Sequence, residues 1–217
     1  MTRGKLILIE GLDRTGKTTQ CTILVQRLKP NAELRKFPDR TTQIGKLIDE
    51  YLTEEKSQLP DQAIHLLFSA NRWEVAEKIK ESLSKGEHVV MDRYVYSGIA
   101  YSAAKETKNM NLEWCLQPDK GLLKPDLTIF LTNEDHRDLE VRDGFGSERY
   151  EKSDFQMKVK EKFFETFEYL NSYTHDIKDD LKVIDVTNKS IEEVSQRIWD
   201  VAKNIIDEEG NREFSYF

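Results

Sequence analysis

A loop near the amino terminus has the residue types and spacing of a phosphate-binding loop. Residues 11–18 read Gly-Leu-Asp-Arg-Thr-Gly-Lys-Thr, after an apolar run and before a helix-like segment. Such glycines let consecutive backbone N–H groups point at phosphate oxygens, the lysine adds a mobile positive charge, and the last hydroxyl can bind Mg2+. The pattern predicts nucleotide binding, and a glycine-rich turn without a ligand is the alternative. The predicted nucleotide-binding residues are Gly11, Asp13, Arg14, Thr15, Gly16, Lys17, Thr18 and Thr19.

Two charged residues inside this loop suggest chemistry beyond binding. Arg14 would direct its guanidinium at the phosphates as charge moves during transfer, which predicts a catalytic role, whereas an exposed loop arginine is the alternative. A carboxylate beside a polyphosphate is repelled, so Asp13 is expected to accept a hydrogen bond from a neutral group or to pair with Arg14. A sugar hydroxyl of a second substrate is the favoured partner.

Polar residues also follow two other strand-like runs. Asp92 comes directly after an apolar run, where P-loop proteins hold Mg2+ directly or through water; an N-cap of the next helix is the alternative role. Arg93 could bind phosphoryl oxygens through two N–H groups. Arg40, after Phe37 and a proline, would add a second phosphate clamp, unless it is a surface residue.

One helix-like segment carries an arginine on an otherwise apolar face. Arg72 shares the face of Ile64, Phe68, Val75 and Ile79 by helical spacing. A buried arginine needs an acceptor, and a base that stacks on Phe68 while Arg72 contacts its edge would explain both residues. A purely structural Phe68 in the core is the alternative.

The order of elements predicts how these segments meet. Strand-like runs occur at 5–9, 33–37, 88–91, 127–131 and 182–186. Helix-like segments lie at 17–28, 43–52, 61–83, a shorter pair near 96–117, 153–170 and 190–206. This alternation predicts an α/β fold with a parallel sheet covered by helices on both faces, and sites in such sheets gather beyond the strands' carboxyl ends. The first three strands would therefore converge on one edge.

Composition narrows the class of protein further. The 217 residues carry a formal net charge of −7, which argues against a nucleic-acid or membrane partner, and one domain is expected over 1–217. Two cysteines without metal spacing and scattered histidines support neither a disulfide framework nor a zinc site. Without a signal peptide or a membrane-spanning run, an intracellular protein is expected, in the cytoplasm and also in the nucleus as a second compartment.

The stretch 133–151 is predicted to be a lid that closes over the site. It contains Gly144-Phe145-Gly146 as hinge glycines and lacks strand or helix periodicity. Its seven acidic residues against three arginines make it a weak phosphate clamp, which again favours Arg14 for catalysis. A loop without function is the alternative.

Together these motifs resemble the thymidylate kinase family, of the eukaryotic, fungal-like type. The likeness runs along nearly the whole chain, through the segments 11–18, 37–40, 68–74, 92–98 with Tyr101, 144–151 and 186–189. It implies a five-stranded P-loop fold of the nucleoside monophosphate kinase type, a homodimer, and ATP- and Mg2+-dependent phosphorylation of dTMP to dTDP.

The resemblance also implies a role for each matching residue. Asp13 would accept from the 3′-hydroxyl of dTMP, and Tyr101 would sit where a ribose 2′-hydroxyl would intrude. The other dTMP-site residues would be Phe37, Arg40, Phe68, Arg72, Arg93, Ser97, Gly98 and Tyr150 from the lid. Arg142 and the segment Thr187, Asn188, Lys189 would border the adenine of ATP, while Thr18 and Asp92 would hold Mg2+.

Two rival functions compete with this interpretation. A kinase for UMP or AMP differs only in its base, and the methyl of thymine contributes about 0.8 kcal/mol by burial, so the choice must rest on Arg72 and on the shape of the pocket. A P-loop switch without a second substrate is the other rival. That function would leave Asp13, Arg40, Phe68 and Arg72 unexplained.

Overall fold

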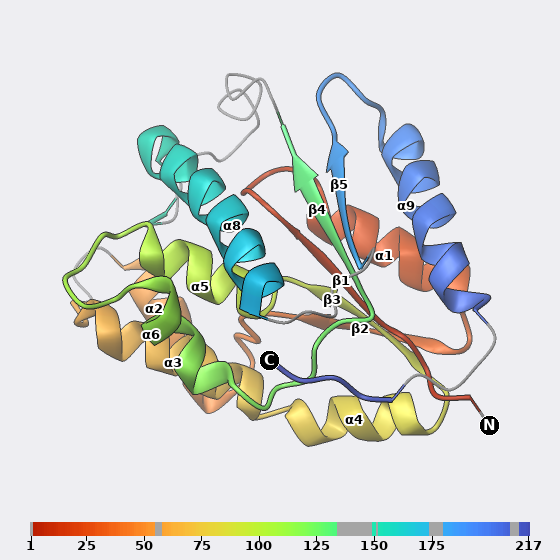
Figure 1. Cartoon of the computed structure of the whole chain (residues 1–217), viewed down its shortest axis with the longest axis horizontal. Helices are drawn as coiled ribbons and strands as arrows, with labels where there is room; N and C mark the ends of the chain where they lie inside the picture. Colours follow the sequence, from red (N-terminus) through yellow and green to blue (C-terminus); the bar gives the residue numbers. More distant parts are fainter. Residues whose placement is uncertain (1, 55–57, 134–148, 151, 174–179, 209–212) are drawn as a thin grey trace.

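The computed structural model describes residues 2–54, 58–133, 149–150, 152–173, 180–208 and 213–217. Strands and helices alternate along the chain as predicted (Figure 1). In chain order the elements are β1 (Leu6–Gly11), α1 (Lys17–Leu28), β2 (Ala32–Lys36), α2 (Gln43–Thr53), α3 (Asp61–Trp73), α4 (Ala76–Ser84), β3 (His88–Asp92), α5 (Val95–Ala103), α6 (Leu112–Leu116), the 3-10 turn η1 (Gln117–Asp119), β4 (Leu127–Thr132), α8 (Ser153–Tyr173), β5 (Leu181–Asp185) and α9 (Ile191–Ile206).

The strands form a parallel sheet in the order β2-β3-β1-β4-β5, which confirms the predicted fold class. The central strand β1 is buried along its whole length. Its side chains alternate, so that Leu6 and Leu8 enter one hydrophobic core while Ile7 and Ile9 enter another on the opposite face. A strand buried on both faces explains why this part of the sequence is continuously apolar.

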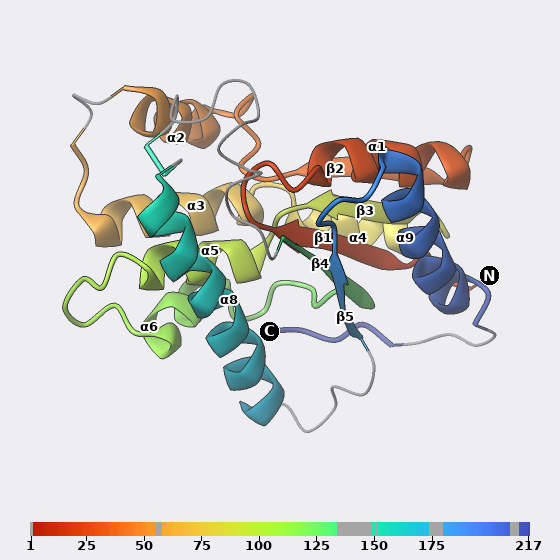
Figure 2. The ribbon, with the colours of Figure 1, turned by 90° about the horizontal axis from the view of Figure 1, so that it is seen from above.

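Helices cover both faces of the sheet (Figures 1 and 2). On one face, α1 and α9 pack through Leu24 and Ile198 against the core that contains Ile7 and Ile9. On the other face, α4, α5 and α8 contribute Ile79, Ile99 and Phe163 to the second core. At the carboxyl ends of the strands, beyond these helical layers, β1 leads into the P-loop and β3 ends at Asp92.

The segment predicted as one helix over 61–83 is two helices, which corrects that expectation. α3 ends at Trp73 and α4 begins at Ala76, with Val75 in a non-helical conformation between them. The break has a packing reason, because Ile64 belongs to a small cluster with α2, whereas Val75 and Ile79 belong to the main core beside the sheet. One straight helix could not bury both sets of side chains.

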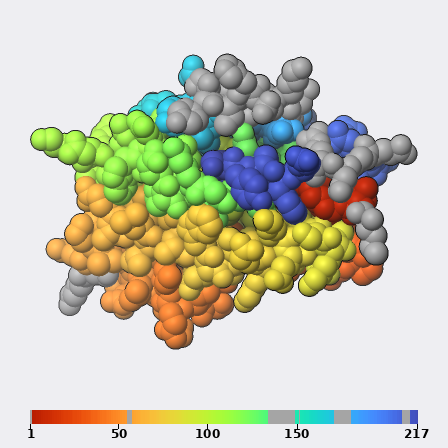
Figure 3. All heavy atoms as spheres, turned by 60° about the horizontal axis from the view of Figure 1, so that its bottom comes forward, coloured from red at the N-terminus to blue at the C-terminus, as the bar shows by residue number. Residues whose placement is uncertain are grey.

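The last residues of the chain return to the body of the protein. Phe217 lies against Tyr94 and Tyr96, with ring centroids 6.1 and 5.4 Å apart, and Tyr216 forms an antiparallel bridge with Leu123. Figure 3 shows this segment on the surface, between the α4 region and the segment that precedes β4. Within the described ranges, none of the helices combines the length and apolar content that crossing a membrane requires.

Candidate active site

A cavity of about 350 Å³ opens at the carboxyl edge of the sheet, which is within the usual size range of small-molecule sites. Its walls come from the P-loop, the end of β2, α3 and the start of α5, segments that are far apart in the sequence. All the residues that the sequence assigned to dTMP line this one cavity: Asp13, Phe37, Arg40, Phe68, Arg72, Arg93, Ser97, Gly98, Tyr101 and Tyr150. Arg14, Gly16, Lys17, Thr18 and Thr19 line it as well.

The P-loop joins β1 to α1 in a conformation that depends on glycine. Gly16 occupies the N-cap of α1 with a positive φ of 87°, a conformation that residues with a side chain rarely adopt. Lys17 is buried, and its Nζ donates to the carbonyl oxygen of Leu12. Burial, and then repulsion from Arg93, lowers the pKa of Lys17 to about 8. The loop therefore holds a positive charge in a position that an anionic ligand would stabilise.

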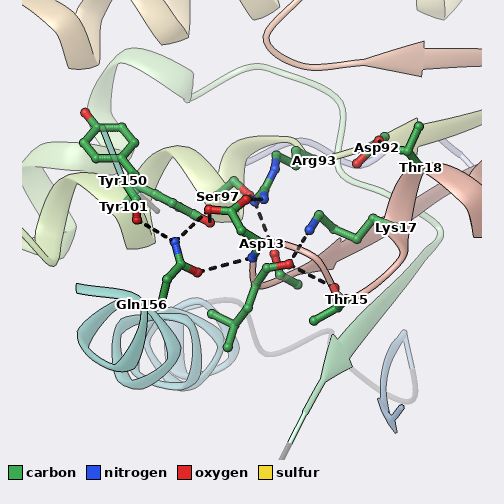
Figure 4. A network of polar contacts seen from close by, with 12 residues as sticks. Asp13, Thr15, Lys17, Thr18, Asp92, Arg93, Ser97, Tyr101, Tyr150 and Gln156 are labelled. Atoms are coloured by element: carbon green, nitrogen blue, oxygen red, sulfur yellow. Dashed lines mark hydrogen bonds and ion pairs between the residues drawn. The ribbon is translucent and has the colours of Figure 1, made fainter. Parts of the chain in front are cut away.

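Thr18 and Asp92 meet beside the P-loop. The Thr18 hydroxyl donates to Oδ2 of Asp92 at 2.5 Å, which brings together two oxygen ligands of the kind that Mg2+ prefers (Figure 4). Asp92 is not the N-cap of α5, because that position belongs to Tyr94, so the capping alternative is wrong. Within the described residues, no group of three or more His, Cys, Asp or Glu side chains could hold a metal. Such a pair suits an ion that takes its remaining ligands from water and phosphates.

Asp13, which lines the cavity, is the centre of a hydrogen-bond network (Figure 4). Its carboxylate pairs with Nη2 of Arg93 and accepts from the Tyr101 hydroxyl at 3.0 Å and from Gln156 Nε2 at 2.7 Å. Burial would raise the pKa of Asp13, but Arg93 and Lys17 outweigh it and lower the pKa. The arginine that pairs with Asp13 is Arg93 rather than the predicted Arg14, and the predicted bond to a sugar hydroxyl stays a prediction.

Arg93 is linked through Ser97 to a buried carboxylate that the sequence analysis missed. Glu10, at 0% exposure, accepts from the backbone N–H groups of Tyr94 and Ser97 at 2.8 and 3.0 Å and from the Ser97 hydroxyl. Ser97 Oγ in turn accepts from Nη1 of Arg93 at 3.1 Å. Burial raises the pKa of Glu10. A glutamate inside an apolar strand was the only signal in the sequence.

Another part of the cavity wall, from α3, combines an aromatic ring with a buried arginine. Phe68 is half-buried and packs beside α2, and it also lines the cavity, so it serves both the core and the site. Arg72 is 3% exposed, and its buried acceptor is Asp119 on η1. Gly98 lies so close that a Cβ there would be 2.7 Å from Nη2 of Arg72. The guanidinium therefore packs on the backbone of α5.

Arg40 also lines the cavity. It pairs with Asp49 on α2 at 2.7 Å, and its side chain is 36% exposed. Phe37 is buried against Tyr94, with ring centroids 5.5 Å apart. Arg40, from the loop after β2, and Arg93, from the segment before α5, thus both supply positive charge to one cavity.

Tyr150, which belongs to the predicted lid, lines the cavity, and Gln156 on α8 connects it to the P-loop. Tyr150 stacks on Phe155, and its carbonyl oxygen accepts from Gln156 Nε2 at 2.9 Å. Oε1 of Gln156 also accepts from the backbone N–H of Asp13 at 3.2 Å, which connects α8 directly to the P-loop. The sequence analysis missed Gln156, since a glutamine in a polar helix gives no distinct signal. Most of the predicted lid, including Arg142 and the hinge glycines, lies outside the described residues.

The predicted adenine segment is at the same edge of the sheet but does not line the cavity. Thr187 donates to Oδ1 of Asn133 at 2.8 Å and to Oδ1 of Asp185 at 2.6 Å, so the turn after β5 is tied to the end of β4. Asn188 has a positive φ of 53° in this turn, and Lys189 lies 3.8 Å from Asp185. These residues therefore lie at the predicted edge of the sheet, but outside the lining of the cavity.

The parallel sheet, its P-loop and a cavity with basic residues beyond the loop define the class of this protein, a P-loop kinase with the nucleoside monophosphate kinase fold. A sequence profile of the family described as thymidylate kinase matches residues 9–198. The chain belongs to the thymidylate kinase family.

Relatives in distant organisms resemble nearly the whole chain. The thymidylate kinase of Schizosaccharomyces pombe is 49% identical over 206 residues, which cover 94% of this chain and 93% of that one. The human thymidylate kinase is 45% identical over 207 residues, covering 94% and 92%. A solved structure of the Candida albicans thymidylate kinase superposes with a TM-score of 0.89 at 45% identity, covering 99% and 98%.

A second solved structure agrees in fold alone. The thymidylate kinase of Ehrlichia chaffeensis superposes with a TM-score of 0.67 at 22% identity.

The family membership shows that this chain is an enzyme that phosphorylates dTMP to dTDP with ATP, and nothing in the comparisons favours a UMP kinase, an AMP kinase or a nucleotide switch.

Proposed function

We propose that the described cavity is where this phosphorylation takes place, with dTMP at the Phe68 and Arg72 end and the phosphates of ATP over the P-loop. One observation carries the proposal, namely that a single cavity joins Lys17 to Arg72 with Arg93 and Arg40 along its wall. Two anionic ligands bound end to end need positive charge at both phosphate groups, and this cavity provides it.

Each residue has a proposed role in this arrangement. Arg40 and Arg93 hold the phosphate of dTMP, and Asp13 accepts from its 3′-hydroxyl while Tyr101, bonded to Asp13, closes the space beside C2′. Phe37, Phe68, Arg72, Ser97 and Gly98 surround the nucleoside, and Tyr150 covers it. Arg142 and Thr187–Lys189 border the adenine, and Gly11, Thr15 and Thr19 shape the loop around the ATP phosphates.

The chemistry of the proposed mechanism is positioning and charge neutralisation. The second ionisation of a phosphate monoester has a pKa of about 6, so the dTMP phosphate is already a nucleophile near neutral pH and needs no strong general base. Lys17 and Arg14 follow the moving phosphoryl group as charge develops. Thr18 and Asp92 would hold Mg2+, which supplies charge neutralisation on the ATP phosphates when it is bound.

The outer face of α3 supports a proposed homodimer. Ala63, Leu66, Ala70 and Trp73 follow one another at helical spacing, and Leu66 and Trp73 are 47% and 42% exposed. Exposed apolar patches mark interaction surfaces, and a second copy of the chain is the partner that we propose for this one. Leu66→Glu is expected to convert the dimer into a monomer in light scattering, whereas an unchanged mass would place the contact elsewhere.

A substrate panel tests the proposed site. Nucleoside monophosphates are offered singly with ATP, and the diphosphate product is followed for the wild-type chain, for Phe68→Ala and for Lys78→Ala on the exposed face of α4 as a control. We expect dTMP to be preferred by the wild type and by the control, and the preference to weaken in Phe68→Ala. An equal loss of activity with all the substrates would contradict the proposal that the base binds next to Phe68. The cytoplasm or the nucleus as compartment stays a prediction.

A further inference from the structure

The short turn η1 places one carboxylate behind the base end of the cavity. Asp119 is 0% exposed, and its ion-pair partner Arg72 is 3% exposed. Oδ2 of Asp119 accepts from Nη2 of Arg72 at 2.6 Å, and Oδ1 accepts from Nε of Arg72 at 3.1 Å and from the Ser69 hydroxyl at 2.7 Å. The pair is therefore bidentate and almost completely removed from water.

Asp119 occupies one edge of the guanidinium and leaves another for a ligand. Arginine has five N–H donors, of which Asp119 engages one on Nε and one on Nη2. In the described part of the chain, Nη1 of Arg72 has no hydrogen-bond partner, although the side chain lines the cavity. The guanidinium also needs the missing side chain of Gly98, since a Cβ there would be 2.9 Å from Nη1.

The turn that carries Asp119 is attached to the helix that carries Arg72. The carbonyl oxygen of Pro118 accepts from the Ser69 hydroxyl at 3.0 Å and from Trp73 Nε1 at 2.7 Å. The backbone of Asp119 also accepts from Leu122 N–H at 3.0 Å. The carboxylate and the guanidinium therefore sit on one rigid unit, and the orientation of Arg72 is set from η1.

We propose that Asp119 is a positioning residue for base selectivity, because it holds the guanidinium of Arg72 in one orientation and so fixes where the remaining N–H donors meet the base. A base with a carbonyl oxygen at that edge, as thymine has, accepts these hydrogen bonds. A base with an amino group there, as cytosine has, sets donor against donor and leaves buried polar groups unpaired. This inference rests on the proposed contact between Arg72 and the base.

Asp119→Asn is the substitution that separates charge from shape. It keeps the volume of the side chain but replaces one acceptor oxygen by an NH2 group, which faces a guanidinium N–H. We expect the Kd of dTMP by calorimetry and its KM to rise about tenfold, and the preference for dTMP over dCMP to fall, while the KM of ATP changes less than about twofold. Asp207→Asn, on the exposed end of α9, is the matched control.

A double-mutant cycle distinguishes positioning from a general structural role. In the Arg72→Met background, Asp119→Asn should change the Kd of dTMP less than about twofold, since Asp119 acts only through Arg72. If the effects of Asp119→Asn and Arg72→Met on the Kd of dTMP are additive, or if Asp119→Asn raises the KM values of dTMP and ATP equally, the inference is wrong while the proposed function still stands. If Arg72→Met itself leaves dTMP binding and the dCMP discrimination unchanged, the proposed base contact fails and the inference falls with it.

A second variant covers the case in which Asp119→Asn does not fold, because breaking a buried ion pair leaves an uncompensated charge. Ser69→Ala removes the hydroxyl that bonds Oδ1 of Asp119 and the carbonyl oxygen of Pro118, and it keeps the ion pair. We expect it to raise the Kd of dTMP about threefold with ATP binding unchanged. An unchanged Kd of dTMP in a folded Ser69→Ala variant would contradict the inference.

Discussion

Lys17→Met is expected to stabilise the nucleotide-free protein while it nearly abolishes turnover. The ammonium of Lys17 is buried beside Arg93, and these surroundings lower its pKa from 10.5 to about 8. At pH 7 the Lys17 amine is protonated in both states. In the folded protein its charge is buried near Arg93, which costs free energy, whereas in the unfolded chain the charge is in water. Methionine has a similar length without the charge, so the substitution removes the penalty together with the contact to ATP.

The size of the effect follows from the pKa. A tenfold change in a proton equilibrium is 1.36 kcal/mol, so lowering the pKa from 10.5 to about 8 corresponds to about 3 kcal/mol. The loss of the hydrogen bond from Nζ to the carbonyl of Leu12 offsets about 1 kcal/mol of this gain. The net rise of about 2 kcal/mol in the free energy of unfolding would raise Tm by about 4–8 °C.

The dependence on pH identifies the lysine as the cause. Between pH 8 and 10.5 the unfolded chain binds the Lys17 proton and the folded protein does not, so the stability of the wild type rises relative to that of the variant. The difference in Tm should therefore be largest at and below pH 7 and shrink as pH rises through this window. Other groups titrate there in both proteins, and the difference between the two proteins cancels them.

Thermal unfolding without nucleotide, at a fixed protein concentration, measures the difference. Lys78→Met, on the exposed face of α4, serves as the control and should leave Tm within about 1 °C of the wild type. Added ATP should reverse the order of the wild type and Lys17→Met, because at about 100 times Kd a ligand adds about 2.7 kcal/mol to the protein that binds it. A lower Tm for the free variant at pH 7, or a gap that does not change with pH, would refute the reasoning.

Three further substitutions test separate parts of the molecule. Arg14→Ala should lower kcat by about 1,000-fold and leave the KM of dTMP nearly unchanged in steady-state assays, and the reverse pattern would assign Arg14 to binding. Phe68→Ala should raise the Kd of dTMP about tenfold in calorimetry and spare ATP, whereas equal losses would make Phe68 a core residue only. Phe217→Ala should lower the free energy of unfolding in urea by about 2 kcal/mol, because its ring packs on Tyr94 and Tyr96; an unchanged midpoint would argue against that packing.

Local sequence patterns predicted the fold class and brought several of the cavity-lining residues together. The apolar run that leads to Gly11 predicts a strand in a parallel sheet covered on both faces, and β1 is such a strand. Because parallel strands present their carboxyl ends at one edge, the residues that follow three separate strands are expected to lie together. The cavity that contains Asp13, Arg40 and Arg93 has this origin.

The partners of individual charges were beyond the reach of the sequence. Asp13 pairs with Arg93, 80 residues away, rather than with its neighbour Arg14, and Arg72 finds its acceptor in Asp119, 47 residues away. Gln156 reaches Asp13 across 143 residues. Which of several carboxylates meets a guanidinium depends on packing that brings elements within a few ångströms, and no spacing rule along the chain encodes it.

Short-range patterns in the chain therefore account for most of the elements, for their parallel arrangement and for many of the residues that line the cavity, because backbone preference and hydrophobic periodicity act over a few neighbouring residues. Long-range packing set the break between α3 and α4, the contacts of the buried carboxylate Glu10 and the orientation of Arg72. These features depend on contacts between distant segments, whose energies are realised only when the core has formed around them.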